Sequence, residues 1–302
     1  MRSRLEHRHA GVVTIALSIL TLSIGSTLIR KTGSPGPVVA FWRLTIAAAV
    51  WHLVAAVRHA RPNLSQWRAV LPAGLCFGGD LIFFFSAVQH TRIANAEFTG
   101  TLAPVIVVPI AAWRLREKVA PRTLALGCVA LTGVALILLT ARGGAGSRRG
   151  DLLAVCAVVT WAGYLLVTRR VRQVVDTNAF MAVMSTVAAV VVAPFALATH
   201  RIASVSGKGW ALITVMAIAN GIVAHGALAW AQRRVPVSTT SMMQLAQPGV
   251  STLWAFLLLG ESVRLVQIAG MAIVLVAVGF IARHTARAPV VPVAETTAAP
   301  AR

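Results

Sequence analysis

The chain has 302 residues, of which 57% are hydrophobic and 12% are charged, and its mean hydropathy is +0.78. An ordinary soluble domain carries about twice that charged fraction, so the composition excludes one and indicates an integral membrane protein. The net charge of +20 would suggest nucleic acid in a soluble protein, but the basic residues here fall between apolar segments, and no nucleic-acid partner is expected.

Ten mostly apolar segments follow one another along the chain. Because crossing a bilayer takes about 20 such residues, they predict an all-α integral membrane fold with ten transmembrane helices. The segments are 11–29, 37–57, 69–88, 93–113, 122–141, 151–168, 179–199, 210–231, 236–259 and 265–282. The polar N-terminal tail (1–10) and the Ala/Pro-rich C-terminal tail (284–302) are expected to be disordered.

The basic residues between these segments predict the orientation in the membrane. With the N-terminus in the cytoplasm, the loops and tails on that side hold 18 Lys and Arg residues, against 9 on the other side. This excess places both termini in the cytoplasm. Arginine outnumbers lysine 25 to 3, which is typical of GC-rich bacterial genomes and suggests a bacterial cytoplasmic membrane.

The second half of the chain repeats the first at an offset of 144 residues. Residues 104–117 read PVIVVPIAAWRLRE and residues 248–261 read PGVSTLWAFLLLGE, so Pro104 falls on Pro248 and Glu117 on Glu261. Five helices per half is an odd number, so the second half must be inverted. Two inverted five-helix repeats (11–141 and 151–283, joined by a linker at 142–150) place a binding site near the membrane midplane.

Three charged side chains lie well inside predicted helices, where lipid disfavours them. Arg43 and Glu97 lie at similar depth near the outer boundary, so we expect them to pair, either structurally or as a gate. Asp80 lies deeper, on the third helix. It either takes and releases a proton, meets a cationic group of a substrate, or bonds structurally to a neighbouring helix.

Several uncharged polar or aromatic side chains are further candidates for a site. Gln244 and Gln247 share a helix face one turn before Pro248, which frees the carbonyl of Gln244. Such a broken turn lines a cavity or is a simple kink, and Pro104 repeats the pattern. The remaining candidates either face a substrate or pack between helices. They are Asn220, His225, Trp161 and Tyr164.

Motifs for other chemistries are missing from the sequence. It has no Walker loop, HExxH or GxSxG motif and no His/Cys metal cluster, so no enzymatic activity, metal or cofactor is expected. An ion gradient, with protons as the candidate coupling ion, or substrate exchange remains as the energy source.

Three segments resemble the EamA-repeat form of the drug/metabolite transporter superfamily. They are AFWRLTIAAAV at 40–50, the segment 80–117, and SMMQLAQPGVSTLWAFLLLGE at 241–261. Each half has a helix with a central Pro, a closing Glu and then a Gly-containing helix, although the first half closes with Arg-Leu-Arg-Glu where the family commonly has Leu-Gly-Glu. The resemblance implies a central cavity, alternating access, and a structural role for Glu117 and Glu261 at helix ends.

The expected function is therefore secondary active transport, with export of small organic solutes across the cytoplasmic membrane. The resemblance implies amino acids, metabolites or amphipathic and cationic compounds, and the few intramembrane charges favour neutral, zwitterionic or cationic cargo. The first alternative is a receptor or assembly partner that transports nothing. The second is an intramembrane enzyme, which would need a nucleophile or metal cluster at mid-depth. The sequence does not predict the oligomeric state.

Overall fold

The computed structural model describes residues 2–90, 93–139, 148–259 and 264–287, and these residues form helices joined by short connections. The first half contains α1 (Arg2–Leu22), α2 (Gly25–Lys31), α3 (Gly36–Val57), α4 (Leu64–His90), α5 (Ile93–Gly100), α6 (Ala103–Arg114) and α7 (Pro121–Leu139). The second half contains α8 (Arg148–Val171), α9 (Thr177–Leu197), α10 (Gly207–Met216), a π-helical segment (Ala217–Ala224), α11 (His225–Gln232), α12 (Val237–Met243), a 3-10 turn (Gln244–Ala246), α13 (Gln247–Leu259) and α14 (Leu265–Arg287).

The ten predicted membrane spans are confirmed, but some of them are divided. The first span is α1 with α2, the fourth is α5 with α6, the eighth runs from α10 to α11, and the ninth runs from α12 to α13. Within the described ranges, seven helical stretches are long and apolar enough to cross a membrane unaided. The chain is a multi-pass membrane protein built from two five-helix repeats.

Several helix ends differ from the sequence prediction. Residues 148–150 of the predicted linker belong to α8, and residues 284–287 of the expected disordered C-terminal tail belong to α14. Residues 2–10 are helical, so the expected disordered N-terminal tail is wrong there; no helix breaker precedes Gly11, and α1 simply extends. The third span begins at Leu64 because Asn63 and Gln66 cap it reciprocally: the Asn63 side chain accepts the Gln66 N–H and the Gln66 side chain accepts the Asn63 N–H. Glu261 and residues 142–147 of the predicted linker lie outside the described residues.

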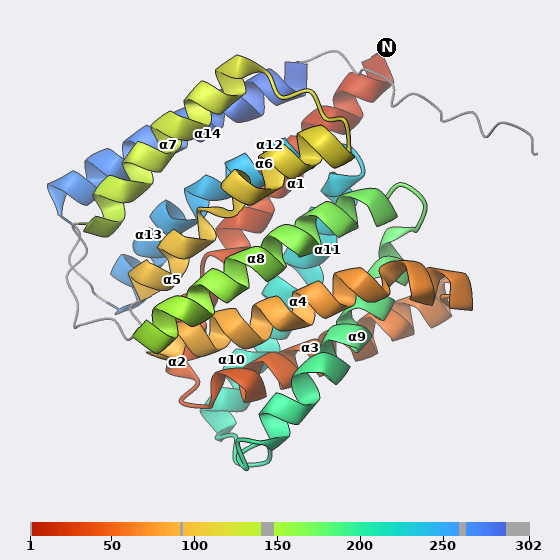
Figure 1. The fold of residues 1–302 in the computed structure, drawn as a ribbon. Coiled ribbons are helices and arrows are strands. Elements are labelled where there is room, and N and C mark those ends of the chain that lie inside the picture. Colours follow the sequence, from red (N-terminus) through yellow and green to blue (C-terminus); the bar gives the residue numbers. More distant parts are fainter. Residues whose placement is uncertain (1, 91–92, 140–147, 260–263, 288–302) are drawn as a thin grey trace, which may run out of the picture.

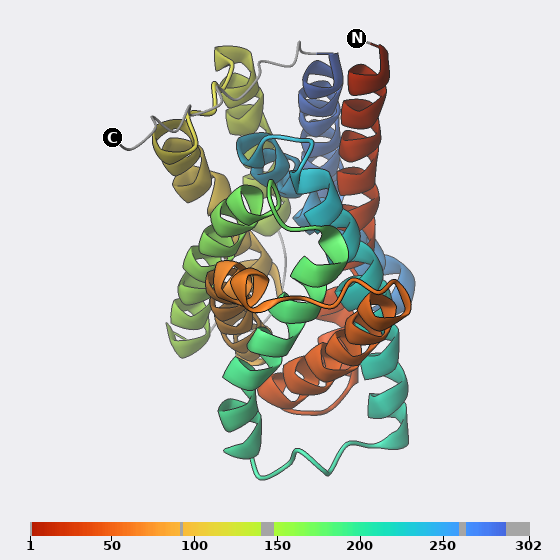
Figure 2. The same cartoon turned by 90° about the vertical axis from the view of Figure 1, so that its right-hand side faces the viewer.

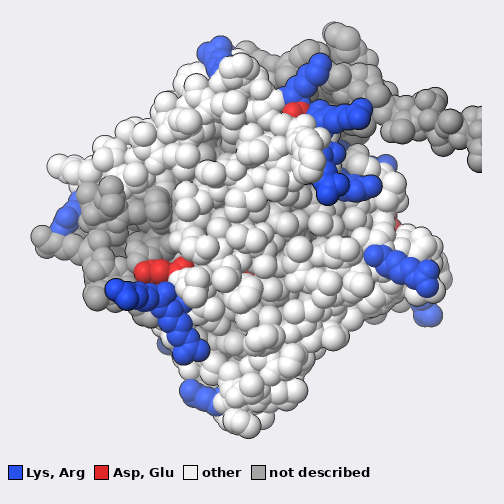
Figure 3. Space-filling view, in the orientation of Figure 1, with Lys and Arg blue, Asp and Glu red and all other residues white. Residues whose placement is uncertain are grey.

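The two repeats interlock side by side. Figure 1 shows α7 and α14, the last helices of the two halves, running together along one edge, while α4 packs against both α8 and α9, and α3 packs against α9. Figure 2 shows the N-terminus and the connection from α9 to α10 at opposite ends of the bundle. Lys and Arg side chains lie towards the borders of the face seen in Figure 3 and leave its middle free of basic groups, as a surface in contact with lipid requires.

Glycines allow the closest helix contacts. A Cβ atom on Gly74 would lie 2.5 Å from the Cβ of Val187, and one on Gly133 would lie 2.7 Å from the carbonyl oxygen of Gly270. Both distances are shorter than any real contact of that kind, so only glycine permits α4 to meet α9, and α7 to meet α14, at this spacing. These close contacts fix the frame around the site.

Candidate substrate cavity

A central cavity opens between the two halves and is lined by seven of the ten spans. Most of the polar residues singled out from the sequence reach it: Arg43, Asp80, Glu97, Trp161, Asn220, His225, Gln244 and Gln247, together with Pro248. Its volume is about 110 Å³, which holds several waters or part of a small solute. Pockets that bury drug-sized ligands start near ~300 Å³, so larger cargo would have to widen it.

Two broken spans shape this cavity, and they break at repeat-equivalent places. In the fourth span the break falls at Thr101 and Leu102, just before Pro104, and in the ninth a 3-10 turn (Gln244–Ala246) precedes Pro248. The sequence predicts that proline leaves the Gln244 carbonyl free. The structure satisfies it locally, because the N–H of Gln247 bonds to it. The tightened turn places the side chains of Gln244 and Gln247 at the cavity.

The expected ion pair between Arg43 and Glu97 is not formed, so that prediction is wrong. Arg43 is 3% exposed, its guanidinium lies 5.5 Å from the ring centre of Phe85, and its Nε and Nη2 atoms have no partner within the described residues. Equal depth was not sufficient, because Glu97 turns towards the first and ninth spans instead.

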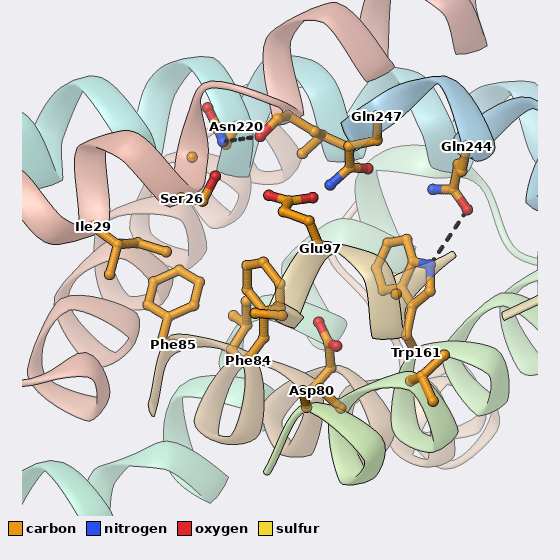
Figure 4. Close-up of a pocket in the computed structure, with 18 of the residues that line it drawn as sticks. Ser26, Ile29, Asp80, Phe84, Phe85, Glu97, Trp161, Asn220, Gln244 and Gln247 are labelled. Atoms are coloured by element: carbon orange, nitrogen blue, oxygen red, sulfur yellow. Dashed lines mark hydrogen bonds between the residues drawn. The ribbon is translucent and has the colours of Figure 1, made fainter. Parts of the chain in front are cut away.

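Glu97 is held by hydroxyl groups from both halves. Its carboxylate accepts a 3.4 Å hydrogen bond from Ser251, which in turn lies 3.1 Å from the hydroxyl of Ser26. Figure 4 shows the carboxylate between Ser26 and the amide of Gln247. This arrangement favours a structural role, since Glu97 joins the fourth span to the first and the ninth.

Asp80 faces the cavity without a partner. It is 9% exposed, and its carboxylate accepts no hydrogen bond from the part of the chain that the structure describes. Arg43 is the charged group that acts on it electrostatically, although the two lie beyond ion-pair distance. The cavity therefore contains one buried cation, Arg43, and two buried carboxylates, Glu97 and Asp80. A hydroxyl group holds Glu97, whereas neither Arg43 nor Asp80 is neutralised by direct contact.

Aromatic rings form one wall. The ring of His225 lies 4.7 Å from Phe77 and 6.0 Å from Trp161, and Tyr164 lies 5.0 Å from both Phe77 and Trp161. Trp161 lines the cavity and donates a 3.3 Å hydrogen bond to Gln244 (Figure 4), whereas Tyr164 lies behind it, fully buried. His225 packs among these rings with its Nδ1 atom unpartnered among the described residues.

The other sequence candidates lie at or beyond the margins. The amide of Asn220 donates to the carbonyl of Leu22 at 3.4 Å, which links the eighth span to the first (Figure 4). Pro104 is buried next to its break and does not line the cavity. Glu117 lies at the end of the fourth span and binds Arg169, Val237 and Ser238 there. Glu261 cannot be compared, because it lies outside the described residues.

Sequence reasoning missed the contribution of the first span. Ser26 and Ile29 line the cavity from α2, which is separated from α1 by a turn at Ser23 and Ile24. No proline marks this turn, and a lone Gly25-Ser26 pair is a weak signal in an apolar run. Phe84 and Phe85 of α4 also line the cavity, and only their spacing from Asp80, about one helical turn, could have indicated it.

Clusters suited to metal binding are not found: within the described ranges no three His, Cys, Asp or Glu side chains gather in one place.

Known proteins share this fold. A crystal structure superimposes with a TM-score of 0.74 over 92% of this chain and 97% of its own, at 22% sequence identity. A protein from Clostridium kluyveri named "Uncharacterized transporter" is 24% identical over 199 residues, and this chain spans 63% of its length. "Aromatic amino acid exporter YddG" from Ancylobacter novellus is 26% identical over 262 residues, which cover 78% of this chain and 85% of that protein.

The model of the EamA-like transporter family matches twice, over residues 9–139 and 148–283. The chain belongs to the EamA-like transporter family. Each match holds five of the ten spans, so the family repeat coincides with the structural halves. This EamA-like transporter therefore places its central cavity between two copies of one helical unit, as inverted-repeat transporters do.

Proposed function

We propose that this membrane transporter exports small zwitterionic solutes, amino acids among them, across the cytoplasmic membrane by alternating access. The observation that carries the proposal is the pair of opposite charges in the central cavity. Arg43 and Asp80 lie in one small cavity, buried and without an ion-pair partner in the described residues. Buried charges are costly unless a partner meets them, and a zwitterion supplies both partners at once.

The groups around these charges suit such a solute. A carboxylate can accept hydrogen bonds from the free Nε and Nη2 atoms of Arg43, and an ammonium group can donate to Asp80. The rings of Phe84 and Trp161 offer an apolar surface for the remainder of the solute. The relative from Ancylobacter novellus is named as an exporter of aromatic amino acids, and this supports both the substrate class and the direction.

The energy source that we propose is an ion gradient, with the proton as coupling ion. Asp80 is the acidic group in the cavity that no described hydrogen bond holds, so it is the best candidate to exchange a proton with water there. The distribution of basic residues supports placing both termini in the cytoplasm. The composition and the two bacterial relatives support a bacterial cytoplasmic membrane.

Flux measurements in proteoliposomes test this function. A mixed pool of amino acids and metabolites is loaded, with and without an imposed pH gradient, and wild type is compared with Asp80→Asn. We expect gradient-driven flux that the variant loses by about 100-fold, whereas solute exchange without a gradient survives in part. Asp176→Asn, at the exposed cap of α9, is the matched control and should transport normally.

A second variant separates recognition from coupling. Arg43→Gln should lower flux of zwitterionic solutes by about 100-fold with or without the gradient, since removing a buried charge-assisted contact costs about 3 kcal/mol. Flux that survives both substitutions would overturn the assignment of the charge pair. A folded protein that binds solute and moves none would instead support the receptor alternative.

A further inference from the structure

A second line of buried polar groups runs from the central cavity towards one end of the bundle. It lies where α8 packs against α11 (Figure 1), a contact that we call the α8–α11 seam. At the cavity end, the His225 ring lies 6.5 Å from that of Tyr164. At the other end, the side chain of Arg172 donates to the carbonyl of Ala229 at 3.0 Å, and that of Arg169 donates to the carbonyl of Gln232. The seam thus joins the cavity to the proposed cytoplasmic end.

The seam contains polar atoms that nothing in the described chain satisfies. Tyr164, Thr168 and Gln232 are each fully buried, and both amide atoms of Gln232 have no hydrogen-bond partner among the described residues. The hydroxyls of Tyr164 and Thr168 interact with each other and have no other partner among those residues. Tyr164 and Thr168 are one turn apart on one face of α8. A permanent contact between helices would fill these positions with small or apolar residues, because an unpaired buried polar atom is costly.

The repeat relates this seam to the cavity itself. At the offset of 144 residues, Leu81 and Phe85 of α4, which line the central cavity, fall on His225 and Ala229 of α11. Val88 falls on Gln232 at the same offset. The carbonyl of each residue accepts a hydrogen bond from an arginine in the first span of its own half. Arg30 donates to Val88 at 3.1 Å, and Arg169 donates to Gln232. Because the repeats are inverted, the seam is the counterpart of the α4 side of the central cavity, turned towards the opposite end of the bundle.

One carboxylate closes the seam at that end. Glu117 accepts the N–H of Val237 at 2.9 Å, the N–H and hydroxyl of Ser238 at 3.1 and 2.7 Å, and the Nε of Arg169 at 3.3 Å. We call Glu117 with these three partners the Glu117 latch. It ties the end of α6 to α8 and to the start of α12. Burial lowers the pKa of the neighbouring Arg172 to about 10, so its guanidinium stays charged at neutral pH.

We propose that the α8–α11 seam is the cytoplasmic half of the solute path, and that Tyr164, Thr168 and Gln232 line it for a polar solute when the Glu117 latch opens. A phenol, a hydroxyl and an amide offer donors and acceptors without net charge, so they can meet both ends of a zwitterion in passage. The inference rests on the proposed transport function and adds to it the part of the path that the present conformation keeps shut.

Apolar substitutions test whether the polar atoms matter for transport. Thr168→Val and Gln232→Leu keep the approximate shape and remove the polar groups, so we expect flux to fall about tenfold, the effect of about 1.4 kcal/mol, while the thermal midpoint stays equal or rises. Thr132→Val is the matched control, because that exposed hydroxyl bonds within its own helix, and its flux should not change. Unchanged flux in both seam variants would overturn the proposal and make the seam a packing contact.

Chemical labelling tests the opening without relying on flux. In protein with Cys76, Cys128 and Cys156 replaced by Ser, Thr168→Cys is exposed to an impermeant cationic methanethiosulfonate from the cytoplasmic side. Adding Glu117→Ala should speed labelling about tenfold, because a shift of about 1.4 kcal/mol in the equilibrium between closed and open seam raises the open population by that factor. Ala130→Cys, buried on α7, is the control and should stay unlabelled.

The two measurements separate the possible failures. If Thr168→Cys stays unreactive once the latch is removed, the seam does not open and the proposal is overturned, whatever the flux. If labelling accelerates but wild type moves no solute under any gradient, the proposed transport function is wrong. The opening of the seam would then be a conformational change of a receptor.

Discussion

Two pairs of repeat-equivalent spans in this EamA-like transporter are built in opposite ways. The fourth and ninth spans are each broken in the middle and bring polar side chains to the central cavity, whereas α7 and α14 are continuous and pack against each other. No described residue of α7 or α14 lines the cavity. The duplication has thus produced one pair that holds the frame and another whose breaks bring polar side chains to the cavity.

Proline alone does not explain the difference. Pro104 and Pro248 each follow a break, but Pro72, Pro109 and Pro194 lie inside helices that continue past them. The two that accompany a break have a cavity-lining residue about one turn before them, Thr101 in one repeat and Gln244 in the other. We infer that a break persists where the side chains beside it face the cavity, and that the helix continues past the proline elsewhere.

The largest effect should come from damaging the continuous pair. Gly133→Leu places a side chain where even a Cβ would lie 2.7 Å from the Gly270 carbonyl oxygen and 2.8 Å from Val274. Forcing α7 from α14 should lower the free energy of unfolding by about 3 kcal/mol or more. Thermal unfolding in detergent, followed by size-exclusion chromatography, measures the loss.

The matched control is Gly279→Leu on α14, where an added Cβ meets nothing within 4 Å. It should keep the wild-type midpoint. Equal damage from both substitutions would mean that α14 tolerates no bulk at all, and the frame would then not depend on the Gly133 contact.

A smaller effect is expected from repairing a break. Pro248→Ala restores the missing N–H and favours a continuous ninth span, because proline disfavours a helix interior by about 3 kcal/mol. Gln244 and Gln247 would then turn from their present positions, so flux should fall about tenfold while the thermal midpoint stays equal or rises. Pro104→Ala should act alike in the other repeat.

Pro194→Ala on the unbroken α9 is the control for this change, and its flux should match wild type. If Pro248→Ala transports normally, the break in the ninth span is not needed for transport. The difference between the broken and the continuous spans would then have no functional role.

The positions of the spans, and the charged residues that line the central cavity, could be predicted from the sequence because both depend on local signals. Apolar length marked the spans, and the cost of a charge in lipid marked Arg43, Asp80 and Glu97, which do line one cavity. The partners of these charges could not be predicted. The similar depth of Arg43 and Glu97 in the membrane predicts that they pair. The rotation of each helix about its axis determines which neighbour a side chain meets, and Glu97 faces Ser251.

The contacts between halves were equally beyond local signals. Glu117 was assigned a structural place at a helix end, and only the folded chain shows that it binds Val237 and Ser238, 120 residues away, together with Arg169. Gln232 and Thr168 drew no attention in the sequence, because an amide or hydroxyl near a span end is common. Their significance depends on their burial and on how few partners they have.

The smallest effect should come from a single hydrogen bond at the margin of the broken ninth span. Trp161→Phe keeps a ring near Tyr164 and His225 but removes the 3.3 Å bond from its indole N–H to Gln244, whose amide nitrogen has no partner among the described residues. Losing one such bond costs about 1 kcal/mol, so solute affinity should weaken about fivefold with maximal flux little changed. Trp113→Phe, 75% exposed at the end of α6, should leave both unchanged. A loss of flux as large as that of Pro248→Ala would show that the indole holds the 3-10 turn open. Trp161 in the aromatic wall would then maintain the break as much as Pro248 does. The difference between broken and continuous spans would depend on side chains from α8.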